Sequence, residues 1–240
     1  MTHPTRFILL CQARTGSTLF GSLLGHHPAI CYVGESFKQY RKWRGVKILL
    51  RPLISRYPLL RLNWLARQAD RPVFGCKLVP HYVRDIQRTI RLAHEHSWLI
   101  IHLTRRSAFK TALSLVVSRK TRRHNTGSDN GQPPAPLLTC NPDALTNAIR
   151  RVEFLKARQQ AALMNIPHLS VSYEDDLANP ACWEEATGRI FDQLGLARLP
   201  AQTAVDRPWN RPYAEMISNY ADLLAHARSN GYGDLLEDAL

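Results

Sequence analysis

The sequence predicts an α/β fold in which a mostly parallel sheet is flanked by helices. Three observations indicate it: five short apolar runs of strand length, segments of helical period between them, and turns where a run meets the next helix. The apolar runs are continuous and do not alternate strictly with polar residues, which is typical of strands covered on both faces. No internal repeat interrupts this order.

The expected elements alternate along the chain. The expected strands are 7–11, 29–33, 73–78, 98–103 and about 168–172. The expected helices lie near 17–25, 35–44, 82–95, 107–123, 142–164, 180–194 and 213–228. Strands interleaved with helices predict parallel pairing, since a helix is the usual connection between parallel strands.

Length and composition fit one soluble domain. The chain has 240 residues, of which 45% are hydrophobic and 21% charged. These values exclude wholesale disorder, a collagen-like fibre and a bundle of membrane spans. We expect a single domain over 1–240, with a basic helical insert at about 38–70 and a mobile loop at about 124–141 that is rich in proline.

The segment 38–67 holds nine Lys or Arg and no Asp or Glu, interleaved with Trp43 and Trp64. It could cover an acceptor site and recognise a sugar with anionic groups, or it could lie on an acidic membrane surface. An ordinary helix pair, with its apolar face in the core and arginine stems along the surface, explains the pattern equally well.

The charge indicates anionic partners. The formal net charge is +13, which fits nucleic acid, a phosphorylated cofactor or an acidic lipid surface. No recognisable nucleic-acid-binding motif accompanies the charge. The first apolar run is too short for a secretory signal, so we expect a cytoplasmic protein.

The cysteines and histidines predict no metal site. The five cysteines lack metal-ligand spacing and are expected to be buried, reduced thiols. The pairs His26–His27 and His94/His96 fall at expected helix ends and are interpreted as surface residues.

A turn rich in hydroxyl residues follows the first expected strand. Cys11 ends the strand, Gly16 lies in the turn, and Ser17 and Thr18 open the next helix. Backbone N–H groups of such a turn and of the helix N-terminus favour a bound phosphate. Ser17 stands where nucleotide-triphosphate loops carry lysine, and Arg14 supplies the cation instead. Simple capping by the two hydroxyl residues is the alternative.

Arg105 and Arg106 follow the fourth expected strand, where a kinase would carry an Asp for Mg²⁺. Ligands of open α/β sheets bind beyond the carboxyl ends of strands, so this arginine pair suggests a second phosphate. We expect Ser107 to cap the following helix and Ser114 to share its face. A solvated arginine pair beside a core-facing helix is the alternative.

Together the two turns resemble those of the sulfotransferases that use 3′-phosphoadenosine 5′-phosphosulfate, especially the bacterial branch that sulfates carbohydrates such as trehalose or nodulation factors. In that family a loop like 14–18 binds the 5′-phosphosulfate, and an Arg followed eight residues later by Ser, as Arg106 and Ser114 are, binds the 3′-phosphate. Further matches lie at 34–37, 75–77, 173–175, 191–195, 217–220 and 231–232. The segment 173–177 has one acidic residue more than the family pattern, which we expect only to shift a helix start.

The resemblance implies roles for particular residues. The cofactor-binding loop comprises Arg14, Thr15, Gly16, Ser17 and Thr18, and Arg14 stabilises the leaving phosphate. Lys77 contacts the same region, and Arg106 with Ser114 holds the 3′-phosphate. Glu35 is the candidate general base, although a carboxylate at a helix start is its alternative interpretation.

The resemblance therefore implies an enzyme of P-loop-containing, sulfotransferase-like fold. It would transfer the sulfuryl group from 3′-phosphoadenosine 5′-phosphosulfate to a hydroxyl of a carbohydrate or glycolipid, without a metal. A P-loop small-molecule or nucleoside kinase and a basic nucleic-acid-binding protein are the alternatives. Peripheral contact with an anionic inner membrane face stays open, as does the oligomeric state, a homodimer included.

Overall fold

The computed structural model describes residues 5–35, 56–121, 137–205 and 212–239. The chain divides into two compact units, Met1–Thr104 with Leu155–Thr203, and Arg105–Phe154 with Ala204–Leu240. The single domain expected from the sequence stays a prediction. The expected helix 35–44 from residue 36 onward, the basic insert up to residue 55 and the expected loop from 124 to 136 lie outside the described residues.

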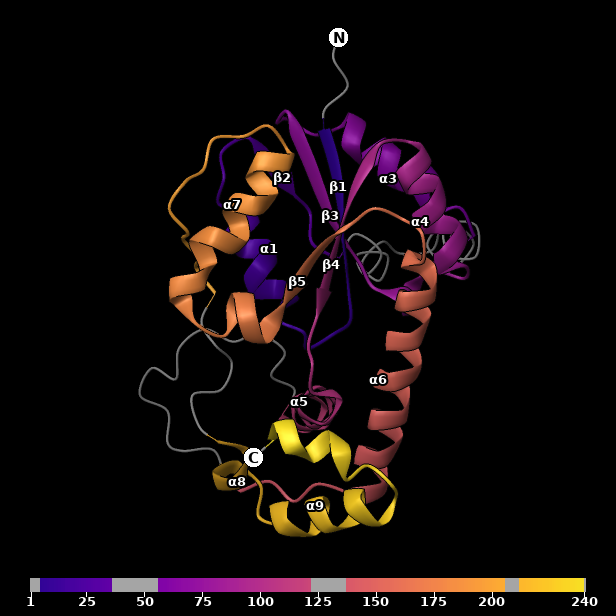
Figure 1. The fold of residues 1–240 in the computed structure, drawn as a ribbon, viewed down its shortest axis with the longest axis vertical. Helices are drawn as coiled ribbons and strands as arrows, with labels where there is room; N and C mark the ends of the chain where they lie inside the picture. The colour runs from indigo at the N-terminus through magenta and orange to yellow at the C-terminus, as the bar shows by residue number, and fades with distance from the viewer. Residues whose placement is uncertain (1–4, 36–55, 122–136, 206–211, 240) are drawn as a thin grey trace, which may run out of the picture. The chain divides into compact units, whose positions relative to one another are not determined.

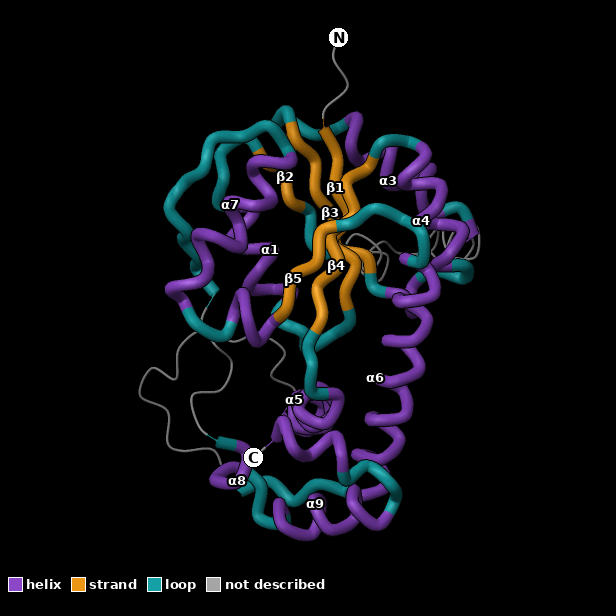
Figure 2. Tube along the Cα trace, viewed as in Figure 1, coloured by secondary structure: helices purple, strands orange, loops and turns teal. Residues whose placement is uncertain are grey.

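The first unit is built on a five-stranded sheet in which neighbouring strands pair in parallel (Figure 2). The strand order is β2-β3-β1-β4-β5. The strands are β1 (Thr5–Cys11), β2 (Ile30–Tyr32), β3 (Val73–Leu78), β4 (Trp98–Thr104) and β5 (Leu169–Ser172). The predicted α/β class with a parallel sheet is confirmed.

Helices cover both faces of this sheet (Figure 1). α1 (Ser17–Gly25) and α7 (Trp183–Gln193) pack on one face, where Phe20 and Phe191 join the strand residues of the core. α3 (Pro58–Arg67) and α4 (Ile86–Glu95) pack on the other, where Leu62 and Ile90 are fully buried. Burial on both faces explains why the strands read as continuous apolar runs.

The second unit is helical. It contains α5 (Ala108–Thr121), the first part of α6 (Pro142–Leu163), α8 (Tyr213–Met216), α9 (Tyr220–Ser229) and a 3₁₀ helix (Asp234–Ala239). Its core includes Phe109, Leu113, Ile149 and Leu223. Within the described part of the chain, no helix is long and apolar enough to cross a bilayer.

The helix predicted at 213–228 is wrong as a single element. The chain breaks between α8 and α9, where Ile217 forms a parallel β-bridge with Leu138. Asn219 accepts from the Cys140 backbone N–H at 2.9 Å and donates to the Cys140 carbonyl at 2.8 Å. These bonds to a distant segment replace the helical ones, so helical periodicity across 217–219 is overridden by tertiary contacts.

Two further helices start later than predicted. The segment predicted as 82–95 begins its α-helix at Ile86, after a 3₁₀ turn at Pro80–Tyr82, because Asp85 caps α4 by accepting the Arg88 N–H at 2.9 Å. The segment predicted as 180–194 opens with a 3₁₀ turn at Pro180–Cys182 and continues as α7.

His27 is buried, so its interpretation as a surface residue was wrong. Its Nδ1 accepts the Ala29 N–H at 3.1 Å, and its ring centroid lies 4.8 Å from that of Phe191. His26, His94 and His96 are exposed, as expected. Of the five cysteines, three are buried and two are half-buried, and all have free thiols.

Candidate functional site

The turn after β1 combines two left-handed residues. Arg14 has φ 69° and Gly16 has φ 84°, and α1 begins directly afterwards at Ser17. A left-handed backbone at a non-glycine residue such as Arg14 is uncommon and is found at ligand-binding turns more often than elsewhere. Alternation of this kind turns successive N–H groups toward a common point, where an anion can be bound.

Gly16 is required here for two reasons. Its φ lies in the region that glycine adopts without strain. In addition, a Cβ at this position would stand 2.6 Å from Cδ2 of Tyr173. The ring of Tyr173 therefore packs directly on the turn and holds its shape.

Hydroxyl side chains stabilise the turn from inside. Thr15 is buried and donates its hydroxyl hydrogen bond to the Gln12 carbonyl at 2.9 Å. Ser17 is also buried, whereas Thr18 is exposed. Gly16 is the N-cap of α1 and has no side chain to cap the helix. The alternative that Ser17 caps α1 is therefore wrong, because Ser17 is the first residue of the helix and Gly16 is its N-cap.

Tyr173 belongs to a π-helical turn, Tyr173–Leu177, that follows β5. The Ala178 N–H donates to the Tyr173 carbonyl at 2.7 Å, five residues back. Asp176 accepts the Ser172 N–H at 2.7 Å and forms an ion pair with Arg189. The extra acidic residue of this segment is thus accommodated by a wider turn and not, as expected, by a shifted helix start.

Glu35 and Lys77 form an ion pair, with 2.7 Å between Lys77 Nζ and Glu35 Oε1. Backbone pairing brings them together: the Lys77 N–H donates to the Gly34 carbonyl at 2.9 Å, and Gly34 has φ 58°, which turns the chain so that Glu35 follows beside β3. The side chain of Lys77 is 7% exposed and that of Glu35 25%. A nearly buried ammonium is stable only when paired, which Glu35 provides.

This ion pair is electrostatically connected to the turn after β1. Burial is the main cause that raises the pKa of the Cys11 thiol, while the nearby Lys77 ammonium lowers it and the Glu35 carboxylate raises it. The neighbouring hydroxyls of Ser17 and Thr15 also lower the pKa of this thiol. Cys11 ends β1, so these groups gather where the central strands end.

Tyr82 was missed by sequence reasoning. Its hydroxyl donates to Glu35 Oε2 at 3.4 Å, so the carboxylate is held by an ammonium on one oxygen and a phenol on the other. The signal was the position of residues 80–82 directly after β3, since the residues that follow a strand lie at its carboxyl end.

The remaining two predicted ligands, Arg106 and Ser114, belong to the second unit. Arg106 is exposed in the bend before α5, and Ser114 is buried within α5. Ser107 accepts the Lys110 N–H at 3.1 Å, which confirms it as the cap of α5. The Ser107 side chain therefore satisfies one of the first N–H groups of α5.

No metal cluster is found within the described ranges, where no three or more His, Cys, Asp or Glu side chains are grouped to hold an ion. The donors collected around the turn after β1 are N–H groups, hydroxyls and cations. Such a set suits an anion.

Comparisons with known proteins give a near-full-length relative. Nodulation protein H of Rhizobium tropici, a sulfotransferase, is 27% identical over 244 aligned residues, which cover 99% of this chain and 95% of the relative. No family model matches the chain.

Two solved structures align at 12% identity. The sulfotransferase from Alicyclobacillus acidocaldarius gives a TM-score of 0.47, with 96% of each chain covered. Shikimate kinase from Bacteroides thetaiotaomicron gives 0.44, with 80% of this chain and 99% of the kinase covered. Both scores are below 0.5, so the assignment rests on the sequence similarity along the chain. That similarity to nodulation protein H, over nearly the full length of both chains, supports a sulfotransferase assignment.

Proposed function

We propose that this sulfotransferase takes the sulfuryl group from 3′-phosphoadenosine 5′-phosphosulfate and transfers it to a hydroxyl of a carbohydrate or glycolipid. The observation that carries the proposal is the Glu35–Lys77 ion pair and its electrostatic connection to the turn after β1. A base and a cation beside an anion-binding turn are the groups that sulfuryl transfer from a phosphate to a hydroxyl needs.

The turn after β1 fits the 5′-phosphosulfate end of the donor. Its left-handed residues and the uncapped N-terminus of α1 offer N–H groups of residues 15–18, and Arg14 adds a permanent cation. The donor supplies an activated sulfuryl group on a phosphate leaving group. Arg14 and the N–H groups would donate hydrogen bonds to the phosphate as negative charge accumulates on it.

Glu35 is the proposed general base. An acceptor hydroxyl is a weak nucleophile at neutral pH, so a carboxylate that takes its proton accelerates the transfer, typically by about 10²- to 10⁴-fold. The ion pair with the Lys77 ammonium holds one carboxylate oxygen of Glu35 in place. Tyr82 orients the second carboxylate oxygen.

Lys77 has a second proposed role. Its ammonium bonds Glu35 at 2.7 Å and acts electrostatically on Cys11 at the start of the turn, which supports a role for Lys77 in contacting both the base and a bound anion. When an anion occupies the site, a second acceptor competes for the three N–H donors of Lys77. Sharing the ammonium in this way would make the Glu35 carboxylate a stronger base when the donor is present.

Arg106 and Ser114 are the proposed ligands of the 3′-phosphate. Ser107 already caps α5, so recognition at this turn depends on side chains. Arg106 is exposed and carries a guanidinium, which binds phosphate through two parallel hydrogen bonds. The carbohydrate-type acceptor is supported by the resemblance of the chain to bacterial carbohydrate sulfotransferases.

Two measurements test the proposal. Adenosine 3′,5′-bisphosphate should raise the melting temperature strongly, because a ligand that binds only the folded state stabilises it, whereas ATP with Mg²⁺ should not. The reverse result would favour a kinase.

In a sulfate-transfer assay, Glu35→Gln should lower kcat by at least 10²-fold and leave adenosine 3′,5′-bisphosphate binding within about threefold. Glu184→Gln, the same change at an exposed position in the first turn of α7, is the matched control and should retain activity. Wild-type turnover by Glu35→Gln would exclude Glu35 as the base.

A further inference from the structure

The helix α3 is apolar on two sides. Leu59, Leu62 and Ala66 are buried against the sheet. On the opposite side Leu60 is 71% exposed and Trp64 is 56% exposed, and Tyr57, one turn before Leu60, is 38% exposed. Spacings of three and four residues place these three side chains on one face of the helix. An exposed Trp–Leu–Tyr stripe of this kind marks an interaction surface.

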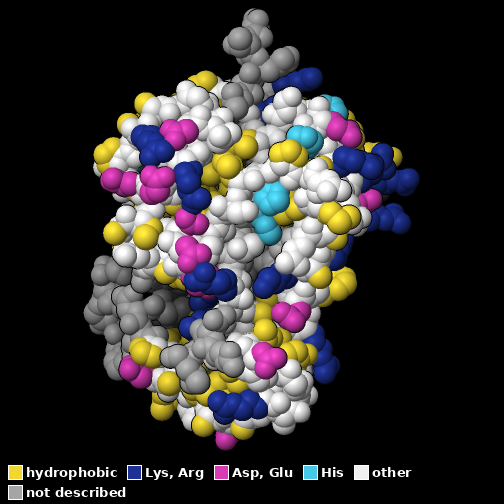
Figure 3. All heavy atoms as spheres, in the orientation of Figure 1, with side chains coloured by type: hydrophobic (Ala, Val, Ile, Leu, Met, Phe, Trp, Pro, Cys, Tyr) yellow, Lys and Arg dark blue, Asp and Glu magenta, His cyan; other side chains and the backbone are white. Residues whose placement is uncertain are grey.

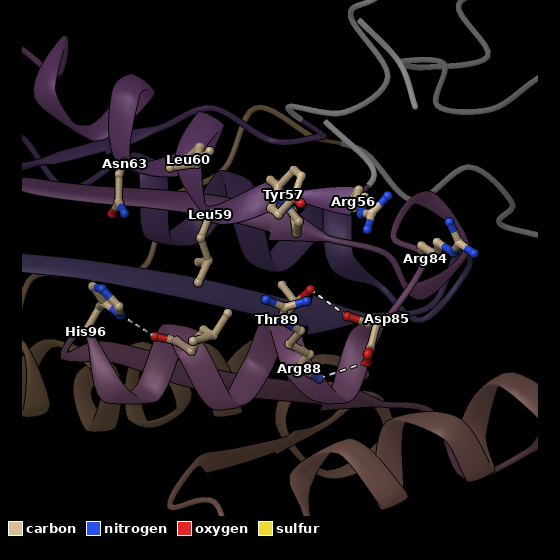
Figure 4. A pocket seen from close by; sticks show the side chains of 12 residues that line it. Arg56, Tyr57, Leu59, Leu60, Asn63, Arg84, Asp85, Arg88, Thr89 and His96 are labelled. Atoms are coloured by element: carbon tan, nitrogen blue, oxygen red, sulfur yellow. Dashed lines mark hydrogen bonds between the residues drawn. The ribbon is translucent and has the colours of Figure 1, made fainter. Parts of the chain in front are cut away.

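A cavity of about 490 Å³ lies beside this stripe, between α3 and α4 (Figure 4). Figure 4 shows Arg56 and Arg84 at one end and Asn63 and His96 at the other. Its walls include Tyr57 and Leu60 as well as the buried aliphatic side chains beneath them. The cavity therefore combines an apolar length with a cationic end.

Arginine dominates the charge of this face. The segments 56–67 and 84–95 contain six arginines and two carboxylates. One carboxylate, Asp85, already accepts the Arg88 N–H as the cap of α4, and the other, Glu95, lies 3.9 Å from Arg91. Figure 3 shows Lys and Arg side chains gathered at the edge of the view where Figure 1 has α4. The arginines are Arg56, Arg61, Arg67, Arg84, Arg88 and Arg91.

The combination favours a lipid surface over an acidic protein. Trp and Tyr prefer the boundary between hydrocarbon and water, and Leu inserts below it. Arginines beside them meet the phosphate layer that surrounds the hydrocarbon, where each basic residue adds electrostatic attraction. An acidic peptide would pair with the arginines but would leave the apolar stripe exposed, unless it carried matching apolar groups.

We propose that the α3–α4 face, comprising Tyr57, Leu60, Trp64, Arg56, Arg84 and Arg88, docks this enzyme on an anionic phospholipid bilayer, with a lipid phosphate at the arginine end of the cavity. The binding is peripheral: the stripe of α3 enters the headgroup boundary while its buried side stays on the sheet. Enzyme and a lipid-anchored hydroxyl acceptor would then meet at one surface.

Vesicle sedimentation of the full chain tests this proposal. With vesicles of phosphatidylglycerol and phosphatidylcholine in equal parts at low salt, we expect binding that falls at least tenfold with phosphatidylcholine alone. Leu60→Ser with Trp64→Ser should weaken binding at least tenfold through lost insertion. Arg84→Glu with Arg88→Glu should weaken it at least tenfold through lost attraction.

Matched controls distinguish vesicle binding by this face from binding through exposed apolar side chains or positive charge elsewhere on the protein. Met164→Ser removes an apolar side chain that is also 71% exposed and lies outside this face. Arg151→Glu with Arg228→Glu gives the same change in net charge on exposed arginines of the second unit. Both controls should bind vesicles within twofold of the wild type.

Three results would overturn the proposal. The first is that the wild type does not sediment with the anionic vesicles. This result is expected if the face binds an acidic protein or a second copy of the chain. The second is equal weakening by the control pair of arginines, and the third is unchanged binding after loss of Leu60 and Trp64. Circular dichroism checks that each variant is folded. Adenosine 3′,5′-bisphosphate binding by the α3–α4 variants should stay within twofold, so this result is independent of the donor proposal.

Discussion

The turns after β1 and β4 looked alike in sequence, since each places arginine and hydroxyl residues between a strand and a helix. Their construction differs. After β1, the glycine N-cap leaves the helix without a side-chain cap, and the left-handed backbone at Arg14 and Gly16 shapes the turn. After β4, Ser107 caps α5 directly. Arg106 is exposed beside it.

This difference separates two ways to bind a phosphate. A turn that uses backbone N–H groups is sensitive to anything that changes its φ and ψ angles, in addition to the loss of a cation such as Arg14. A turn whose helix N-terminus is already capped depends on its arginines. A substitution that changes the backbone conformation should therefore disturb the turn after β1 most, and loss of Arg106 should disturb the turn after β4 most.

The largest effect is expected for Gly16→Ala. The new Cβ would stand 2.6 Å from the Tyr173 ring at a residue with φ 84°, so both strain and a clash oppose it. We expect sulfate transfer to fall at least 100-fold and the free energy of unfolding to fall by about 2 kcal/mol. Gly195→Ala is the control, because Gly195 has φ 66° but open space around it. Donor binding and turnover measure the outcome, and equal activity losses in the two variants would show that the packing of Tyr173 on the turn is irrelevant.

A second effect concerns stability alone and involves β4, the strand that leads into the second turn. β4 carries His102, whose pKa is lowered to about 4 by burial and, second, by His168. In the unfolded chain His102 binds a proton below pH 6.5, whereas in the folded chain it binds one only at about pH 4. This stability is complete above pH 6.5 and is lost as the pH falls toward 4, by about 2 to 3 kcal/mol.

Urea titrations at several pH values measure that loss. His102→Gln should reduce the change in the free energy of unfolding between pH 6.5 and pH 4. The same substitution at the exposed His96 should leave that change as in the wild type. A wild-type curve that is already flat over this interval would refute a buried neutral imidazole in β4.

The smallest effect is expected for Ser107→Ala. Loss of the cap leaves the Lys110 N–H without its serine acceptor, so the free energy of unfolding should fall by about 1 kcal/mol. Adenosine 3′,5′-bisphosphate binding should change less than threefold, because Ser107 holds the helix and not the ligand. Ser229→Ala, at an exposed serine that ends α9, should cost nothing measurable in denaturation. A tenfold loss of ligand affinity in Ser107→Ala would place this serine among the ligands.

Local patterns were sufficient for part of this structure. The helix Ser17–Gly25 and the strand Val73–Leu78 have their predicted bounds, because glycine, hydroxyl residues and apolar runs determine them locally. The break at 217–219 was missed, since its partners at Leu138 and Cys140 lie about 79 residues away.

The candidate site shows the same division. Sequence reasoning selected Glu35 and Lys77 separately, but their pairing depends on the bond between the Lys77 N–H and the Gly34 carbonyl, across 43 residues. The contact of Gly16 with Tyr173 joins β1 to β5 and has no local signal. Residue types were predictable, whereas contacts set by strand order were not.

The most direct test of the account is the affinity of two nucleotides, adenosine 3′,5′-bisphosphate and adenosine 5′-phosphate, measured by calorimetry for the wild type and Arg106→Ala. Arg106→Ala should bind the bisphosphate about tenfold to a hundredfold more weakly than the wild type and the monophosphate less than threefold more weakly, since only the bisphosphate offers a phosphate to Arg106. Equal losses on both nucleotides would contradict the account.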